Sequence, residues 1–253
     1  IVVLIVTLIA FKKSHAPIKK FDQVRSDFVA NASHELKTPV AGIRLLSEAI
    51  RDAAEIEDKK SLNLFIDRLD NEAERLQRLV IDLLDLSRLE ETPDPDRCPR
   101  TDLHSAIVTS FMAHKGEAED KHLDLVLDDR SVTGDDCYAD MEPSDASLVF
   151  DNLIENAIMY TDEGSILVTF EPRGHEIAVI VQDTGIGIPQ TDQSRIFERF
   201  YRVDKARSRE VGGTGLGLSL VRHAVERSKG RVSVKSNPGE GSQFTVVFPR
   251  AKR

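Results

Sequence analysis

The sequence predicts a multidomain chain in which an all-α helical hairpin is followed by an α+β two-layer sandwich. Apolar residues recur at three-, four- and seven-residue steps between residues 21 and 83, as they do along amphipathic helices. Prolines then fall among charged residues in the segment 92–100, which is typical of a linker. Beyond residue 101, helical periods alternate with strand patterns, which favours helices segregated against a mixed or antiparallel sheet.

The composition supports folded domains and argues against several classes of function. A chain of 253 residues, 40% of them hydrophobic, is long enough for about two domains with their own cores. It carries 34 Lys+Arg against 43 Asp+Glu, a net charge of −9. We therefore expect no nucleic-acid partner, because phosphate binding needs clustered base. Cys98 and Cys137 are too few for a disulfide framework and lack metal-ligand spacing, so we interpret them as ordinary thiols.

The first eleven residues, Ile1–Phe11, form an apolar run interrupted only by Thr7. At about 1.5 Å per residue, this run cannot cross a hydrocarbon core of about 30 Å. Lysines follow it before any acidic residue, at Lys12, Lys13, Lys19 and Lys20. Because this bias is typical of the cytoplasmic side of membrane helices, we expect residues 1–11 to be the end of a truncated transmembrane helix. The chain, which starts at Ile, would then be a fragment on the cytoplasmic side of the inner or plasma membrane. A signal-peptide core and an ordinary buried helix are the alternatives.

Two long amphipathic helices are expected within residues 12–91. The apolar stripe of the first consists of Phe21, Val24, Phe28, Ala32, Leu36, Ile43, Leu46 and Ile50. After a polar break at Arg51–Lys59, a heptad seam is formed by Leu62, Ile66, Leu69, Ala73, Leu76, Val80 and Leu83. Two helices with a short connection form an antiparallel hairpin but cannot enclose a core. We therefore expect a homodimer in which two chains make a four-helix bundle; docking of the hairpin on its own C-terminal domain is the alternative.

The segment 101–250 is expected to form the second domain. Helices are predicted at about 102–119, 144–160 and 216–228, and strands near 124–127, 137–139, 165–170, 176–182, 231–235 and 243–248. A turn is predicted at Pro172-Arg173-Gly174. The stretch Asp183–Gly213 has no clear periodicity, and long irregular segments inside compact domains are usually lids or binding loops.

His34 is the candidate nucleophile of the first domain. A helical projection from Phe21 places His34 away from the apolar stripe and Thr38, one turn later, on the same outward face. A neutral imidazole is a competent nucleophile near pH 7, and the neighbouring Glu35 could accept its Nδ1 proton while Nε2 attacks. Pro39 removes a helical hydrogen bond to the carbonyl of Glu35 and should bend the helix.

The segment around His34, residues 33–39 (SHELKTP), resembles the phosphoacceptor box of sensor histidine kinases. Residues 151–157 (DNLIENA) are similar to the asparagine box of the same family. The resemblance implies that Asn156 ligates Mg²⁺, that Asn152 contacts the phosphates or the metal shell, and that Tyr160 belongs to the nucleotide site. One or two side-chain oxygens plus a triphosphate suit Mg²⁺, which gives up its waters reluctantly.

Three further motifs match the family in order. Residues 183–189 (DTGIGIP) resemble the first glycine box, in which Asp183 would accept from the adenine amino group while Gly185 and Gly187 let the backbone approach. Residues 196–202 (IFERFYR) match the phenylalanine box. Residues 213–218 (GTGLGL) match the second glycine box, whose N–H groups at a helix start would bind phosphate. That last box consists of Gly213, Thr214, Gly215, Leu216, Gly217 and Leu218.

The irregular stretch also carries a local excess of base in an acidic chain. Its cations are Arg195, Arg199, Arg202, Lys205, Arg207 and Arg209, against Glu198 and Asp204. Such a segment can close over a triphosphate, and we expect Arg202 to act in catalysis there. The sequence Lys205–Arg209 looks like that of the phosphate-starvation group of sensor kinases.

The five boxes imply a sensor histidine kinase of a two-component system with a Bergerat (GHKL) ATP-binding fold. The implied reaction is autophosphorylation of His34 from ATP·Mg²⁺ and transfer to an aspartate of a cognate response regulator, with Glu35 and Thr38 serving the reverse dephosphorylation. Two alternatives remain. Type II topoisomerases, Hsp90-like chaperones and mismatch-repair ATPases share the ATP-binding fold but lack a phosphoacceptor His. A non-catalytic dimeric scaffold is supported only by Met159, where many family members carry Lys or Arg.

Overall fold

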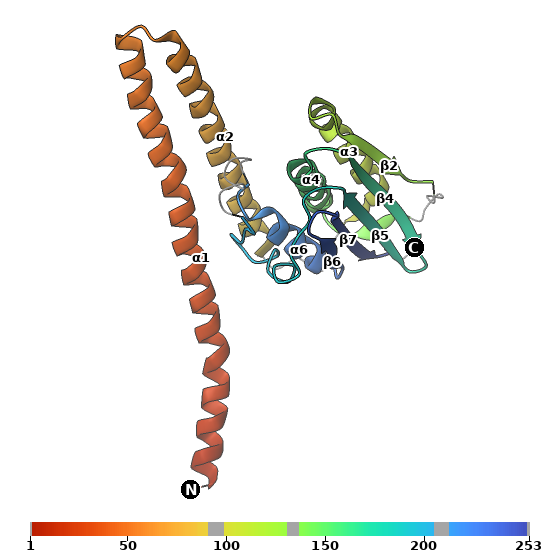
Figure 1. Ribbon diagram of the computed structural model, residues 1–253. Coiled ribbons are helices and arrows are strands. Elements are labelled where there is room, and N and C mark those ends of the chain that lie inside the picture. Colours follow the sequence, from red (N-terminus) through yellow and green to blue (C-terminus); the bar gives the residue numbers. More distant parts are fainter. Residues whose placement is uncertain (1, 91–98, 131–136, 205–212, 252–253) are drawn as a thin grey trace. The chain divides into compact units, whose positions relative to one another are not determined.

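The computed structural model describes residues 2–90, 99–130, 137–204 and 213–251, with side chains from Phe28 onward. The chain forms two compact units, Ile1–Leu79 and Val80–Arg253 (Figure 1). Among the residues that the structure describes, no helix has both the length and the apolar composition that a membrane crossing requires. The predicted linker falls largely on 91–98, which lies outside the described residues.

The first unit is built from α1 (Val2–Glu55) and the larger part of α2 (Lys59–Glu90), so the predicted helical hairpin is confirmed. The connection is shorter than the polar break at Arg51–Lys59 suggested, because α1 continues to Glu55 and buries Ala53. Asp58 starts α2: its carboxylate accepts from the N–H groups of Lys60 and Ser61, both at 3.2 Å. The polar composition therefore located the connection between the two helices but overestimated its length.

The second unit contains a five-stranded sheet in the order β2-β4-β5-β7-β6 (Figure 1). Its strands are β2 (Asp124–Asp128), β4 (Ser165–Arg173), β5 (Glu176–Asp183), β6 (Arg231–Asn237) and β7 (Gly241–Pro249). The pairing of β2 with β4 is parallel and the other three pairings are antiparallel, so the sheet is mixed, which is one of the two arrangements predicted. Two short strands, β1 (Arg100–Asp102) and β3 (Tyr138–Asp140), pair separately.

In the described part of this unit, three helices complete the sandwich: α3 (Leu103–Asp120), α4 (Pro143–Tyr160) and α6 (Gly217–Arg227). Along β4, Ile166, Val168 and Phe170 are buried while Leu167 between them is 37% exposed, so one face of the sheet is covered. The apolar side chains of the helices fill the space above that face; they include Leu153, Ile154, Ile158, Leu220, Val221 and Ala224, all buried. The predicted α+β two-layer architecture is confirmed.

Two boundaries in this unit differ from the sequence prediction. β1 was not predicted, because its three residues follow a proline and form a strand only by pairing with β3, as in Thr101 opposite Ala139. β4 and β5 extend to Arg173 and Glu176, so the hairpin turns at Gly174, which has φ +60°, instead of starting at Pro172. Proline is tolerated here because β2 ends opposite Thr169 and leaves this part of β4 at an edge.

Candidate active site

His34 lies on the exposed side of α1, which confirms the helical projection. Thr38 is exposed one turn later, and its hydroxyl donates to the carbonyl of His34 at 3.3 Å. α1 continues through Pro39 to Glu55. The imidazole of His34 and the hydroxyl of Thr38 therefore share one accessible surface of the first unit.

Glu35, next to His34, is held by an arginine that sequence reasoning missed. Arg75 of α2 places Nη2 at 3.8 Å from Oε2 of Glu35 and Nη1 at 3.3 Å from Oε1 of Glu72. Arg75 is only 8% exposed, which is unusual for a charged side chain unless it is paired. The heptad pattern did not identify Arg75 as buried, and a contact between residues forty positions apart cannot be predicted from the period of a single helix.

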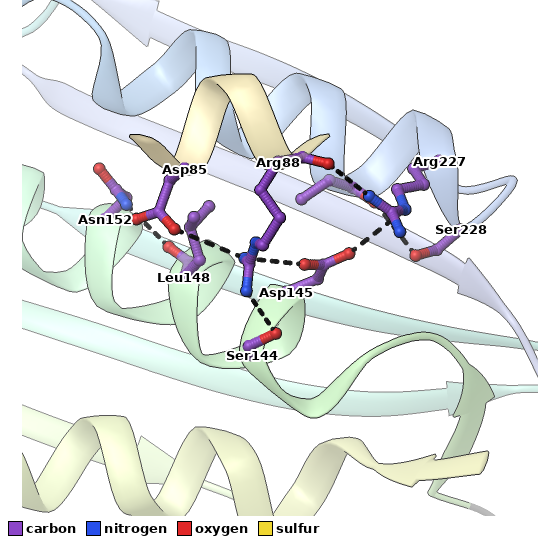
Figure 2. Close-up of polar contacts among 9 residues, drawn as sticks. Asp85, Arg88, Ser144, Asp145, Leu148, Asn152, Arg227 and Ser228 are labelled. Carbon is purple, nitrogen blue, oxygen red and sulfur yellow. Dashed lines mark hydrogen bonds and ion pairs between the residues drawn. The ribbon is translucent and has the colours of Figure 1, made fainter. Parts of the chain in front are cut away.

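Two side-chain amides on one face of α4, the asparagine face, are held in fixed orientations by hydrogen bonds. Asn152, Asn156 and Tyr160 are half-buried at four-residue steps, and apolar side chains fill the opposite side of the helix. The amide nitrogen of Asn152 donates to the carbonyl of Leu148 at 2.8 Å (Figure 2), and that of Asn156 donates to the carbonyl of Asn152 at 2.7 Å. Both amides are thus oriented by their own helix, and their Oδ1 atoms are the ends that could accept from a ligand or coordinate one.

Asp183 ends β5 and is 6% exposed. Its Oδ1 accepts from the N–H groups of Gly185 at 2.9 Å and Ser242 at 3.1 Å. Burial raises the pKa of the Asp183 carboxyl above its ordinary value, and these backbone hydrogen bonds oppose that shift. Because both bonds end on Oδ1, the carboxylate is fixed in orientation and Oδ2 can accept from a bound ligand.

The glycines after Asp183 allow close backbone contacts with neighbouring segments. A Cβ on Gly185 would overlap the carbonyl oxygen of Tyr160, which also accepts from the N–H of Ile186 at 3.2 Å. Gly187 has φ +70°, and a Cβ there would overlap the carbonyl oxygen of Asn237. The first glycine box is therefore joined to the C-terminal end of α4, where Tyr160 lies.

The second glycine box leads into α6 and lies against the asparagine face. Gly217 begins α6, and a Cβ on it would overlap Oδ1 of Asn152. Gly215 has φ +76°, and its carbonyl accepts from the N–H of Phe200 at 2.8 Å. Leu216 is fully buried, while Gly213, Thr214 and Leu218 are half-buried. Two motifs that are far apart in the sequence, 151–157 and 213–218, thus meet at the start of α6.

The phenylalanine box forms a series of hydrogen-bonded turns. Ile196 donates to the carbonyl of Asp192 at 3.0 Å, and the hydroxyl of Tyr201 donates to the carboxylate of Asp192 at 2.5 Å. Arg202 lies close to the second glycine box, since its Nε is 3.2 Å from the Cβ position of Gly215. The remaining lid cations of the prediction, Lys205, Arg207 and Arg209, lie outside the described residues.

The predicted residues therefore fall into two groups. His34, Glu35 and Thr38 belong to the first unit, and the asparagine, phenylalanine and glycine boxes converge within the second. Comparison with protein families places these two groups of residues in two different domains. Residues 24–92 match the His Kinase A (phospho-acceptor) domain, and residues 141–252 match the "Histidine kinase-, DNA gyrase B-, and HSP90-like ATPase" domain.

The chain belongs to the sensor histidine kinase family. The phosphoacceptor domain decides this, because the ATPase domain by itself is shared with gyrase and Hsp90. The sequence is 38% identical over 234 residues to the "Sensor-like histidine kinase SenX3" of Mycolicibacterium smegmatis. That match covers 91% of this chain and 59% of the relative, so the chain spans about three fifths of the length of that curated relative.

Solved structures of histidine kinases share the fold. The histidine kinase ThkA, solved in complex with the response regulator protein TrrA, superimposes with a TM-score of 0.71 over 95% of this chain and 67% of that one, at 21% identity. Full-length ShkA, solved in complex with AMPPNP, superimposes with a TM-score of 0.63 over 90% of this chain and 47% of that one, at 24% identity. At these identities the agreement concerns the fold.

The oxygen atoms of the asparagine face are compatible with Mg²⁺ bound together with a triphosphate. In the part of the chain that the structure describes, no cluster of three or more His, Cys, Asp or Glu could hold a metal ion alone. Oδ1 of Asn156 is the side-chain oxygen that its own hydrogen bond directs away from the helix. A single protein oxygen supplemented by phosphate oxygens and water is a common arrangement for this ion. When bound, Mg²⁺ would neutralise phosphate charge.

Proposed function

We propose that this chain transfers the γ-phosphoryl group of ATP to His34 and then to an aspartate of a cognate response regulator. The observation that carries the proposal is that one chain contains both an exposed His34 on α1 and a second unit in which Asn152, Asp183 and Gly217 converge. The family membership supports the same activity.

In the proposed reaction, Nε2 of neutral His34 attacks the γ-phosphorus in line with the leaving oxygen. A P–N bond forms, the P–O bond to the β-phosphate breaks, ADP leaves, and the proton on Nδ1 is released. Positioning and charge neutralisation account for most of the acceleration in such transfers. Asp183 would orient the adenine, Asn152 and Asn156 would hold the phosphates and Mg²⁺, and Arg202 would face the transferred phosphoryl group.

Labelling with γ-labelled ATP and Mg²⁺ tests the proposal, with the His34→Ala variant beside the unmodified chain. We expect a protein-bound label that is stable to alkali, labile to acid and absent from the variant. Steady phosphate release without protein label would favour a hydrolytic ATPase of the same fold. Nucleotide binding without label or release would favour a non-catalytic scaffold with Met159 as its signature.

Thr38 supports a second activity, the dephosphorylation of the regulator. Its exposed hydroxyl lies one turn from His34 and could position a water for attack on a phosphoaspartate. We expect Thr38→Ala to lower regulator phosphatase activity about tenfold or more while autophosphorylation of His34 persists. Release of phosphate from a purified phosphorylated regulator measures this, with Thr109→Ala on α3 as the matched control. Full phosphatase activity in Thr38→Ala would remove Thr38 from this role.

We also infer that the chain acts as a homodimer at a membrane. Apolar residues of the hairpin remain exposed, among them Val40 at 54% and Leu45 at 66%, which suits a four-helix bundle of two chains. The apolar run Ile1–Phe11 and the lysines after it fit the cytoplasmic side of a membrane helix. Flotation with lipid vesicles, with and without residues 1–20, tests the membrane attachment.

A further inference from the structure

The C-terminal end of α2, from Val80 to Glu90, is part of the second unit. Its apolar side chains Leu86 and Leu89 are 0% and 6% exposed. Arg88 places Nη1 at 2.7 Å from the hydroxyl of Ser144 and Nη2 at 3.0 Å from Oδ1 of Asp145, both at the start of α4 (Figure 2). The end of α2 is therefore docked against the nucleotide-binding unit through both apolar and charged groups.

Asp145 is the centre of this docking. It is 1% exposed, and burial raises the pKa of its carboxyl, whereas the charges of Arg88 and Arg227 oppose that rise. Arg227 of α6 places Nε at 3.8 Å from Oδ2 of Asp145 and donates from Nη1 to the carbonyl of Arg88 at 3.1 Å (Figure 2). A buried carboxylate with two arginines is costly to break by removing one partner, so it anchors this end of α2 firmly.

The anchor brings an acidic side chain to the second glycine box. Asp82 lies six residues before Arg88, and its Oδ2 accepts from the hydroxyl of Thr214 at 2.5 Å. The same hydroxyl oxygen accepts from the N–H of Leu216 at 3.2 Å. A hydroxyl carries one proton and can donate it to one acceptor at a time. A phosphate oxygen that takes the Thr214 proton must therefore displace Asp82.

We propose that Asp82 is a built-in competitor of the nucleotide, held at the phosphate-binding loop by the docked end of α2. The proposal rests on the proposed function, in which the glycine box containing Thr214 receives the phosphates. Two anionic acceptors at one donor repel each other strongly in a partly buried site. Nucleotide binding must break the contact between Asp82 and Thr214, so bound nucleotide weakens the docking of the α2 end. By linkage, undocking of the α2 end strengthens nucleotide binding by the same factor by which the nucleotide weakens docking.

The test measures the Kd of AMPPNP with Mg²⁺ by calorimetry on the full chain, so that the readout does not depend on phosphoryl transfer. We expect Asp82→Ala to bind AMPPNP about fivefold more tightly or better, since allosteric couplings usually start near that factor. Asp82→Asn, which keeps the shape and loses the charge, should also bind more tightly. Asp70→Asn is the control, because it makes the same change of charge at an exposed position of α2.

A double-mutant cycle with the anchor separates a specific competitor from a general effect of charge. Arg88→Gln should by itself tighten AMPPNP binding, and in that background Asp82→Ala should add little. An unchanged or weaker affinity in Asp82→Ala would overturn the inference and leave the proposed function standing. An absence of binding in the unmodified chain and in all variants would contradict the proposed nucleotide site and this inference with it.

Discussion

Gly217 is the residue at which the two halves of the proposed nucleotide site meet. It starts α6, and a Cβ at this position would overlap Oδ1 of Asn152 on α4. That oxygen is the end of a side chain and can move away. The fold would therefore tolerate alanine at position 217, but Asn152 would lose its orientation toward the phosphates.

We predict that Gly217→Ala weakens AMPPNP binding about tenfold, the effect of losing one contact of about 1.4 kcal/mol. The thermal midpoint should change little, because the displaced atom is not part of the core. Gly116→Ala on α3 is the matched control: nothing lies within 4 Å of its Cβ position, so binding should be unchanged. Its stability should rise by up to about 1 kcal/mol, the difference in helix propensity. Equal affinities in the two variants would contradict this geometry.

Asp183 links the site to the pH dependence of stability. Its carboxyl pKa is raised in the folded chain by burial, so the folded state binds more protons than the unfolded state between the two pKa values. The stability contributed by this group therefore falls as pH rises from about 4, the unfolded pKa, through the raised folded pKa. This direction is opposite to that of a carboxylate paired with a cation.

We predict that Asp183→Asn gains unfolding free energy relative to the unmodified chain, and that the gain is larger at pH 7 than near pH 4. The Oδ1 of asparagine can still accept from Gly185 and Ser242, so the fold is retained. Urea denaturation at both pH values measures the gain. Glu176→Gln provides the comparison, because the hydrogen bonds from Arg231 lower the pKa of Glu176. Its substitution should therefore reduce the unfolding free energy, and reduce it more at pH 7 than near pH 4. A gain from Asp183→Asn that was larger near pH 4 would contradict the assignment of burial as the dominant cause.

Only part of the heptad seam of α2 is covered within the first unit. Leu62, Leu69 and Leu76 are half-buried, whereas Ile66 and Ala73, on the alternate positions of the same seam, are exposed. A stripe of this kind normally meets another helix. The unused half of the seam is the surface through which we expect a second chain to bind.

We predict that Ile66→Lys converts the dimer to a monomer at concentrations where the unmodified chain is dimeric, because a lysine on this seam would be buried without a partner. Sedimentation equilibrium measures the mass, and circular dichroism checks that the helices are retained. Asn63→Lys adds the same charge at an exposed position one turn away and should remain dimeric. An Ile66→Lys chain that stayed dimeric would place the interface elsewhere.

The elements themselves could be predicted from the sequence wherever their signal was local. The periods of α1, α2 and α4 and the alternation in β4 and β5 lie within single segments, and the boxes are contiguous motifs. β1 could not be predicted, because three residues become a strand only through pairing with β3. The same holds for the contacts of Arg75 with Glu35 and of Asp82 with Thr214, which join segments that are far apart in the sequence.

In the whole molecule, the residues proposed for phosphoryl transfer are divided between two units. His34 belongs to Ile1–Leu79, while Asn152, Asp183 and Gly217 belong to Val80–Arg253. The proposed phosphoryl transfer therefore requires that a nucleotide bound to the second unit reach the imidazole of the first. The boundary between the two units falls within α2, between Leu79 and Val80, so the predicted linker at 92–100 belongs to the second unit by its place in the sequence.

The most direct test of this account is to locate the phosphate on the chain after incubation with ATP and Mg²⁺. Tryptic digestion under alkaline conditions yields the peptide Ser26–Lys37, in which His34 is the one histidine. We expect a phosphate on this peptide that acid removes, attached at Nε2 of His34, and its loss in His34→Gln. An acid-stable phosphate on Ser26 or Ser33, or an acid-labile phosphate on a peptide from residues 80–253, would contradict it.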